Sequence, residues 1–209
     1  MKTEKMVPDK KDRMANILYK IDAVKFGVYK LSNGKSSPYY IDLRVIPSFP
    51  DAFREICDFY AETITNQIGL KNFDRVAGIP IAGIPFASQI AYNLKKPFLY
   101  VRRGIKLQGR ERRVDGVLVS GEKVLLVDDL LTTGTTLKEA AEAVRAEGGV
   151  VTDAIVFLDR EEGGKQPLEN NKIKVHAMLN IGEVAKTLYE IDAIDQESLR
   201  TIKKQIKKA

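Results

Sequence analysis

The sequence predicts an α/β protein with a mostly parallel central sheet flanked by helices. Two observations support this fold class. From about residue 75 onward, short apolar segments alternate with helical patterns of about 10 to 15 residues, which is typical of βαβ units. The strand segments are nearly continuous apolar runs, as expected where helices cover both faces of a sheet. The chain has 209 residues, enough for one domain with a sizeable core.

The first part of the chain has a different pattern. Apolar residues between positions 11 and 24 recur at helical spacing, which predicts a helix. Two short β-prone segments, at 28–31 and 39–43, are separated by turn-forming residues and are predicted to form a hairpin-like unit. A second helix is expected from Pro50 to Ile68, where Gly69 ends it.

The alternating region follows this second helix. It contains no internal repeat and no low-complexity segment. Two further helices are expected at the C-terminal end of the chain. The predicted strands cover residues 75–79, 97–101, 123–127, 150–158 and 174–179, and the helices among them cover 83–94 and 136–149.

The composition narrows the functional classes. A net charge of +6 favours anionic partners such as phosphates, carboxylates or nucleic acid. One cysteine, Cys57, excludes an intramolecular disulfide, and one histidine, His176, leaves too few ligands for a zinc site. No apolar run has the length of a signal-peptide core or a membrane span, so we expect a cytoplasmic protein without a membrane partner. The basic C-terminal tail indicates a solvated amphipathic helix, so no nucleic-acid partner is expected.

The most informative segment is VLLVDDLLTTGTT, at residues 124–136. Ligands of open α/β sheets bind beyond the C-terminal ends of the strands, where we expect Asp128 and Asp129. A carboxylate accepts two hydrogen bonds, which suits the vicinal diol of a ribose. The following loop leads into a helix, so its backbone amides and threonine hydroxyls can cradle a phosphate, and Gly134 lets the backbone approach the ligand closely.

This segment therefore predicts a ribose 5-phosphate site. An ordinary turn between a strand and a helix would need only one acid and one threonine as caps. Two acids, four threonines and a glycine exceed that need. The segment is not a Walker loop, and no GxGxxG motif follows a first strand, so a dinucleotide-binding fold is not expected.

The segment resembles the phosphoribosyl diphosphate (PRPP) motif of type I phosphoribosyltransferases, which is a strand, two acids and a loop rich in threonine and glycine. Three further segments narrow the resemblance to the orotate phosphoribosyltransferases, and together they cover nearly the whole chain. These segments are FGVYKLSNGKSSPYYIDLR (26–44), YVRRGIKLQG (100–109) and VTDAIVFLDREEGGKQPLENNKIKVHAM (151–178).

The resemblance implies a single phosphoribosyltransferase domain over residues 1–209, with a hood subdomain formed mainly by about residues 1–45. It implies transfer of ribose 5-phosphate from PRPP to orotate, giving orotidine 5'-monophosphate and pyrophosphate in pyrimidine nucleotide (UMP) synthesis. It further implies Mg2+ held mainly by PRPP and water, and a homodimer. In that dimer a basic loop, roughly Ile105 to Gly116, closes over the neighbouring subunit's site, with Gly104 and Gly116 as hinges.

The resemblance also assigns residues to PRPP. Many bacterial members have a lysine at the position of Ala82, so any contact there uses the backbone. Many members have a histidine at the position of Gln108, and glutamine cannot transfer a proton as histidine can. The catalytic residues implied are Lys106, Asp128 and Asp129. The PRPP-binding residues implied are Ile81, Ala82, Arg102, Arg103, Lys106, Gln108, Asp128, Asp129, Leu130, Leu131, Thr132, Thr133, Gly134, Thr135 and Thr136.

The segment from Arg102 to Arg113 carries six basic residues against one acid, Glu111. A solvated basic loop would have this composition. A pyrophosphate leaving group gives a stronger reason for such a density of positive charge.

For orotate, the resemblance assigns residues in the hood and after the strand at 150–158. Arg160 is expected at the same sheet edge as the PRPP loop, where its planar guanidinium would match an acceptor edge of the pyrimidine. The alternative is a surface salt bridge between Arg160 and a neighbouring acid, Asp159, Glu161 or Glu162. Ser32 stands where many members have lysine. The orotate-binding residues implied are Lys25, Ser32, Tyr40, Ile41, Thr132 and Arg160.

Two other functions remain open from the sequence. A purine phosphoribosyltransferase would share the PRPP loop but would not explain the hood segment or LDREEGG. A regulator that senses PRPP without turnover is a different class, although no helix-turn-helix pattern accompanies the basic tail.

Overall fold

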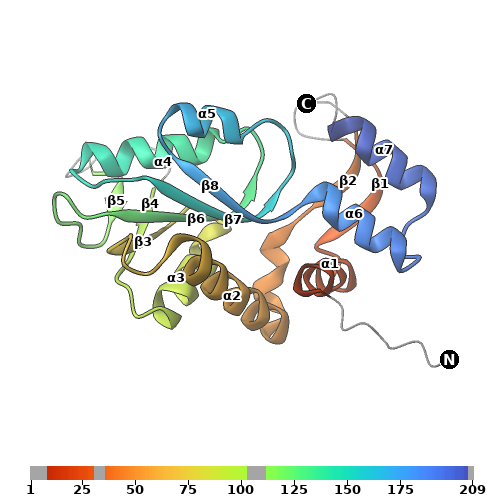
Figure 1. Cartoon of the computed structure of the whole chain (residues 1–209), viewed down its shortest axis with the longest axis horizontal. Helices are drawn as coiled ribbons and strands as arrows, with labels where there is room; N and C mark the ends of the chain where they lie inside the picture. Colours follow the sequence, from red (N-terminus) through yellow and green to blue (C-terminus); the bar gives the residue numbers. More distant parts are fainter. Residues whose placement is uncertain (1–8, 31–35, 103–111, 207–209) are drawn as a thin grey trace.

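The computed structural model describes residues 9–30, 36–102 and 112–206 (Figure 1). Its centre is a six-stranded sheet in the order β5-β4-β3-β6-β7-β8. All neighbouring strands run parallel except β5, which is antiparallel to β4. The predicted α/β fold with a mostly parallel sheet is therefore confirmed. The strands are β3 (Arg75–Gly78), β4 (Phe98–Val101), β5 (Val114–Asp115), β6 (Val124–Leu131), β7 (Asp153–Asp159) and β8 (Lys174–Asn180).

Helices cover both faces of this sheet, which explains why its strands are apolar throughout. On one face lie α2 (Pro50–Thr63) and α3 (Gly83–Asn93), and on the other lie α4 (Thr135–Ala146) and α5 (Lys165–Asn170) (Figure 1). Two separate hydrophobic clusters result, one on each face of the sheet.

The N-terminal part forms a second, smaller unit beside the sheet. Helix α1 (Lys10–Lys20) is followed by β1 (Val24–Lys30) and β2 (Ser36–Ile41), which pair antiparallel in a sheet of their own. Helices α6 (Ile181–Glu190) and α7 (Gln196–Ile206), from the other end of the chain, lie against this unit (Figure 1). The hairpin-like unit and the two closing helices that the sequence predicts are thus present.

Some boundaries differ from the predicted ones. The first helix ends at Lys20 rather than near Val24, because Asp22 has a φ of 59° and Val24 already pairs with Ile41. The helix from Pro50 reaches Ile68 as predicted, but its last turn, Ile64–Ile68, is a π-helix. The sequence analysis did not predict β5 or α5, which have two and six residues, or the 3-10 turn at Leu43–Ser48.

The single cysteine and the single histidine are both buried structural residues. Cys57 is buried in α2, and burial raises the pKa of its thiol to about 12. His176 is buried in β8, where its Nε2 lies 2.8 Å from Oδ1 of Asp153 in β7.

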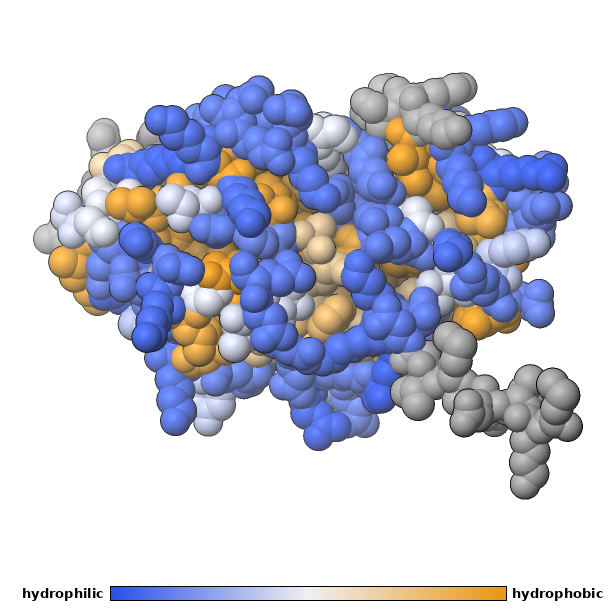
Figure 2. Space-filling model, viewed as in Figure 1, coloured by the Kyte–Doolittle hydropathy of each residue, from blue (hydrophilic) through white to orange (hydrophobic). Residues whose placement is uncertain are grey.

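Hydrophilic side chains cover most of the face seen in Figure 2, with apolar residues showing between them. Among the described residues, none of the helices combines the length and the apolar character that a membrane crossing requires.

Candidate active site

A reversal of strand order places a crevice between β3 and β6. From β3 the chain continues through α3 to β4 on one side, whereas from β6 it continues through α4 to β7 and β8 on the other. Ligands of open α/β sheets bind at such a switch point, beyond the carboxyl ends of the strands. The segment after β3 and the segment at the end of β6 therefore line this crevice together.

The two acids lie inside β6 rather than at its end, which corrects the predicted strand boundary. Pairing with β3 stops at Gly78 and Val127, but pairing with β7 continues to Leu131. Because β3 is the shorter neighbour, Asp128 and Asp129 extend past it at the crevice. The sequence pattern missed this because a carboxylate is an unusual residue for the interior of a parallel sheet.

The turn after β3 packs directly against Asp128. A Cβ added at Gly83 would lie 2.8 Å from Oδ1 of Asp128 and 2.8 Å from the carbonyl oxygen of Val127. Only glycine fits this space, so the close approach brings Ile81 and Ala82 to the same crevice. Ile81 is 75% exposed and Ala82 immediately precedes α3.

Hydrogen bonds fix the backbone around the two acids. The amide of Asp129 donates to Oδ1 of Asp128 over 3.0 Å, and the hydroxyl of Tyr60 in α2 donates to the carbonyl oxygen of Asp128 over 2.7 Å. Burial raises the pKa of Tyr60, and the nearby negative charges of Asp129 and Asp128 raise it further, so the hydroxyl remains a donor. Burial also raises the pKa of the Asp129 carboxyl.

The loop after β6 has the form expected of a phosphate cradle. Gly134 precedes α4 with a φ of 79°, and Lys138 donates its amide to the carbonyl oxygen of Gly134. The amides of residues 135–137 therefore precede the first bond of the helix ladder and point out of its N-terminus. The hydroxyls of Thr133 and Thr135 lie 3.1 Å apart on the same loop.

A pair of glycines joins this loop to the loop after β7. A Cβ on Gly134 would lie 2.6 Å from the carbonyl oxygen of Gly164. A Cβ on Gly164 would overlap the carbonyl oxygen of Thr132 and lie 3.0 Å from the amide nitrogen of Gly134. The two loops thus touch through their backbones, and a side chain at either position would separate them.

Arg160 follows β7 and lies beside the end of β6, where its amide donates to the carbonyl oxygen of Leu131 over 3.0 Å. Its side chain is only 12% exposed, lies 5.1 Å from the ring of Tyr39 and forms an ion pair of 2.9 Å with Glu162. The alternative ion pair therefore exists, but the guanidinium is buried rather than on the surface.

Nε of Arg160 is buried and has no hydrogen-bond partner among the described residues, whereas Nη2 forms the ion pair with Glu162. The buried hydroxyl of Tyr39 lies beside this guanidinium. Buried polar atoms of proteins are nearly always satisfied, so unsatisfied ones indicate a place for water or a ligand. The sequence analysis did not select Tyr39. Its position in an alternating strand beside Tyr40 was a signal, but the sequence could not tell which ring faces the sheet.

The described hood residues selected from the sequence lie on the hairpin that carries Tyr39. Lys25 pairs with Tyr40 across the hairpin, and its Nζ lies 3.5 Å from Asp22. Tyr40 is 38% exposed, and because neighbouring side chains of a strand point to opposite faces, its ring does not join Tyr39 at Arg160. Ile41 is half-buried at the end of β2.

Arg102 follows β4 at the beginning of the basic segment. Its Nε lies 2.7 Å from Oδ2 of Asp115, and it also donates to the carbonyl oxygen of Arg112. Its backbone amide donates to Arg113, so both ends of the basic segment lie side by side. The other selected residues of this segment and of the hood, Arg103, Lys106, Gln108 and Ser32, lie outside the described residues.

No group of three or more His, Cys, Asp or Glu side chains that could hold a metal occurs within residues 9–30, 36–102 and 112–206. The crevice holds the two neighbouring carboxylates of Asp128 and Asp129, and Arg160 lies beside the end of the same strand. This set can bind hydroxyls, anions and metal-bound water.

The fold and the crevice define a phosphoribosyltransferase: a family model described as the phosphoribosyl transferase domain matches residues 50–185. An orotate phosphoribosyltransferase of Cenarchaeum symbiosum (strain A) is 39% identical over 191 residues, which cover 91% of this chain and 96% of that protein. The crystal structure of orotate phosphoribosyltransferase from Aeropyrum pernix has a TM-score of 0.71 at 30% identity, covering 86% of this chain and 99% of that one. The structure of Leishmania donovani UMP synthase has a TM-score of 0.84 at 30% identity, covering 95% of this chain and 42% of that one.

The chain therefore belongs to the orotate phosphoribosyltransferase family. The family resemblance found in the sequence is confirmed. The individual site residues remain predictions, and the geometry above gives the reasons for testing them.

Proposed function

We propose that this protein transfers ribose 5-phosphate from PRPP to a ring nitrogen of orotate, giving orotidine 5'-monophosphate and pyrophosphate. The observation that carries the choice of base is the buried guanidinium of Arg160, whose Nε has no hydrogen-bond partner among the described residues and which lies beside the ring of Tyr39. Orotate carries a carboxylate, whereas adenine and hypoxanthine do not. A buried cation with a remaining donor next to a ribose-phosphate loop therefore suits orotate.

In the proposed reaction the bond between C1 of the ribose and the pyrophosphate oxygen breaks as the bond from C1 to the ring nitrogen forms, and the proton of that nitrogen is released to the pyrophosphate or to water. C1 gains oxocarbenium character, by analogy with other glycosyl transfers. Asp128 and Asp129 accept hydrogen bonds from the ribose hydroxyls, and the loop of residues 132–136 holds the 5-phosphate. Arg102, with the basic residues that follow it, stabilises the departing anion. The protein contributes mainly position and electrostatics.

We further propose that Mg2+ takes part, bound mainly through PRPP and water. Two carboxylates, Asp128 and Asp129, fit a hard cation that retains several waters, because they can accept hydrogen bonds from those waters. When bound, Mg2+ neutralises developing charge on the leaving pyrophosphate. Asp128 and Asp129 would orient the hydrated ion and the ribose together.

We also propose a cytoplasmic homodimer whose basic loop, roughly residues 105–116, completes the neighbouring subunit's site. Gly116, at the end of this loop, has a φ of 118°, a conformation that favours glycine. A Lys106→Ala subunit and an Asp128→Asn, Asp129→Asn subunit should each be nearly inactive alone. Activity should return when the two are mixed, measured in heterodimers isolated with two affinity tags. Inactive heterodimers would contradict sharing across the interface.

The test of the overall function compares bases. The protein is mixed with PRPP and Mg2+, and then with orotate, adenine or hypoxanthine. Loss of orotate absorbance, with no consumption of the purines, is expected. Consumption of a purine would instead identify a purine phosphoribosyltransferase, and PRPP binding without turnover of any base would identify a regulator.

A further inference from the structure

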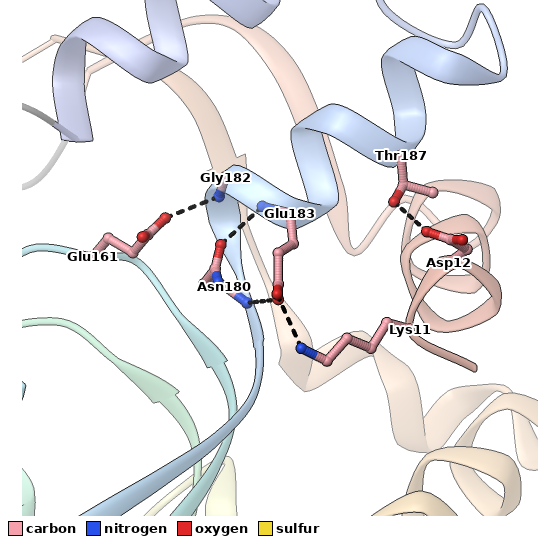
Figure 3. Close-up of polar contacts among 7 residues, drawn as sticks. All are labelled: Lys11, Asp12, Glu161, Asn180, Gly182, Glu183 and Thr187. Atoms are coloured by element: carbon pink, nitrogen blue, oxygen red, sulfur yellow. Dashed lines mark hydrogen bonds and ion pairs between the residues drawn. The ribbon is translucent and has the colours of Figure 1, made fainter. Parts of the chain in front are cut away.

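Two neighbouring glutamates follow Arg160, and they make different contacts. Glu162 forms the ion pair with the Arg160 guanidinium. Glu161 has a different partner: its Oε2 accepts a hydrogen bond of 3.1 Å from the amide of Gly182, in the first turn of α6 (Figure 3). A carboxylate at a helix N-terminus is stabilised by the helix dipole and by the unpaired amides there.

The backbone at Glu161 is in an unusual conformation that needs support. Its φ is 56°, in the left-handed region that residues with a Cβ seldom adopt. Its amide donates to Oδ1 of Asp159 over 2.8 Å, and Asp159 is itself buried and paired with Lys165 at 2.9 Å. The chain therefore turns at Glu161, directly after Arg160, and the Glu161 carboxylate bonds this turn to α6.

Helix α6 offers a fixed point for this contact. Asn180 and Glu183 form a capping box, and Asn180 lies opposite Asp159 in the ladder of β7 and β8. Lys11 of α1 also bonds Glu183 over 2.9 Å, as Figure 3 shows. The first turn of α6 is thus held both by the central sheet and by the N-terminal unit that supplies Tyr39.

Gly182 leaves room for the Glu161 carboxylate. A Cβ at this position would lie 2.9 Å from Oε2 of Glu161, close enough to displace it. Gly182 lies within α6 and has no left-handed φ, so its backbone would accept alanine without strain. A substitution at either Glu161 or Gly182 can therefore disrupt this contact.

We propose that Glu161 is a positioning residue: its contact with the N-terminus of α6 fixes the backbone of Arg160, so that the guanidinium is presented to the base. This inference rests on the proposed function, and it assigns Glu161 to selection of the acidic base rather than to binding of PRPP. Glu161 itself touches neither substrate in this proposal.

The test uses steady-state kinetics of the full chain with PRPP, Mg2+ and orotate. Glu161→Ala removes the carboxylate and Gly182→Ala displaces it, so each should raise KM for orotate about tenfold, equivalent to about 1.4 kcal/mol. The kcat and the KM for PRPP should stay within about twofold, because both changes leave the PRPP loop intact. Glu161→Gln keeps an acceptor oxygen and should restore most of the affinity for orotate.

Two comparisons distinguish a loss of Arg160 positioning from a general loss of folding stability. Alanine favours helices over glycine, so Gly182→Ala should keep or raise Tm while it weakens orotate use. The double variant Glu161→Ala, Gly182→Ala should resemble the single variants instead of multiplying their effects, because both act through one contact. The control variant is Glu190→Ala, which removes an exposed glutamate of the same helix and should change neither KM.

An unchanged orotate KM in variants of an active protein would overturn this inference alone. So would equal increases in KM for both substrates together with a lower Tm. Absence of orotate turnover in the unmodified protein would overturn the proposed function and this inference with it.

Discussion

Two neighbouring loops at the same edge of the sheet are built in different ways. In the segment that ends β6 and follows it, residues 128–136, most of the following contacts join residues of the segment itself. The amide of Asp129 donates to Asp128, the hydroxyls of Thr133 and Thr135 lie 3.1 Å apart, and Gly134 precedes the next helix; Tyr60 of α2 adds a bond to Asp128. The segment that ends β7 and follows it, residues 159–165, has contacts among its own residues, and it is also bonded to the end of β6 and to the first turn of α6.

This difference affects how well the function of each loop can be predicted from the sequence. A site formed by consecutive residues leaves a compact pattern in the sequence. A site formed by one arginine depends on which elements fold against it. The two loops still meet through Gly134 and Gly164, so the proposed phosphate and base sites share one wall. Substitutions can separate the contributions of the two loops.

The largest effect is expected from the two acids near the end of β6. Changing both Asp128 and Asp129 to asparagine removes two charged acceptors for ribose hydroxyls. A hydrogen bond to a charged group contributes about 1.5–3 kcal/mol, so the loss of two should lower kcat/KM for PRPP by roughly a hundredfold or more. Saturation curves for PRPP at fixed orotate and Mg2+ measure this. Unchanged PRPP use would exclude both acids from the site.

The single substitution Asp129→Asn has a distinct effect on stability. Burial raises the folded-state pKa of Asp129 above its unfolded value, so this group stabilises the fold at low pH, and that contribution is lost as the pH rises through the folded pKa. Asp129→Asn should therefore be as stable as the wild type or more stable at neutral pH. Its advantage should disappear as the pH falls below the unfolded pKa of about 4. Denaturant unfolding at several pH values measures this, and a less stable variant at pH 7 would contradict it.

A smaller and more selective effect is expected from the loop after β7. Arg160→Ala should weaken orotate use about ten- to a hundredfold, since one charged hydrogen-bonding group is lost. PRPP affinity should change much less, because the guanidinium lies at Tyr39 and not at the phosphate loop. The orotate and PRPP saturation curves of the variant decide this. Equal losses for both substrates would indicate that the whole site has collapsed. No loss for either substrate would mean that Arg160 serves only in its ion pair with Glu162.

The smallest effect is expected where the two loops touch. Gly164→Ala forces a Cβ against Thr132 although its own φ of −66° is unstrained, so the loops must separate. Such overpacking costs about 1–3 kcal/mol of stability, and KM should rise several-fold for both substrates. The matched control is Gly121→Ala, which has a φ of 88° but no atom within 4 Å of its Cβ. It should lose about 1–2 kcal/mol of stability without changing either KM. Similar kinetics for the two variants would contradict the role of the contact.

Much of the fold could be predicted because its signals are local. Apolar runs identify β6, β7 and β8, and Gly69 ends the helix from Pro50 in the sequence as in the structure. Short elements such as β5 and α5 could not be predicted, because so few residues carry no clear periodicity. The end of β6 was misplaced because it depends on how far β7 extends beside it, which is a tertiary property.

The candidate site divides in the same way. The PRPP-type loop and, through resemblance, the family could be predicted from the sequence, because both are carried by consecutive residues whose chemistry does not depend on distant contacts. Contacts between distant segments place Gly83 against Asp128 and Gly164 against Thr132, and they turn Tyr39 rather than Tyr40 toward Arg160. The physical reason is that strand order, helix packing and the direction of a side chain are fixed by burial across the whole chain, which no single segment encodes.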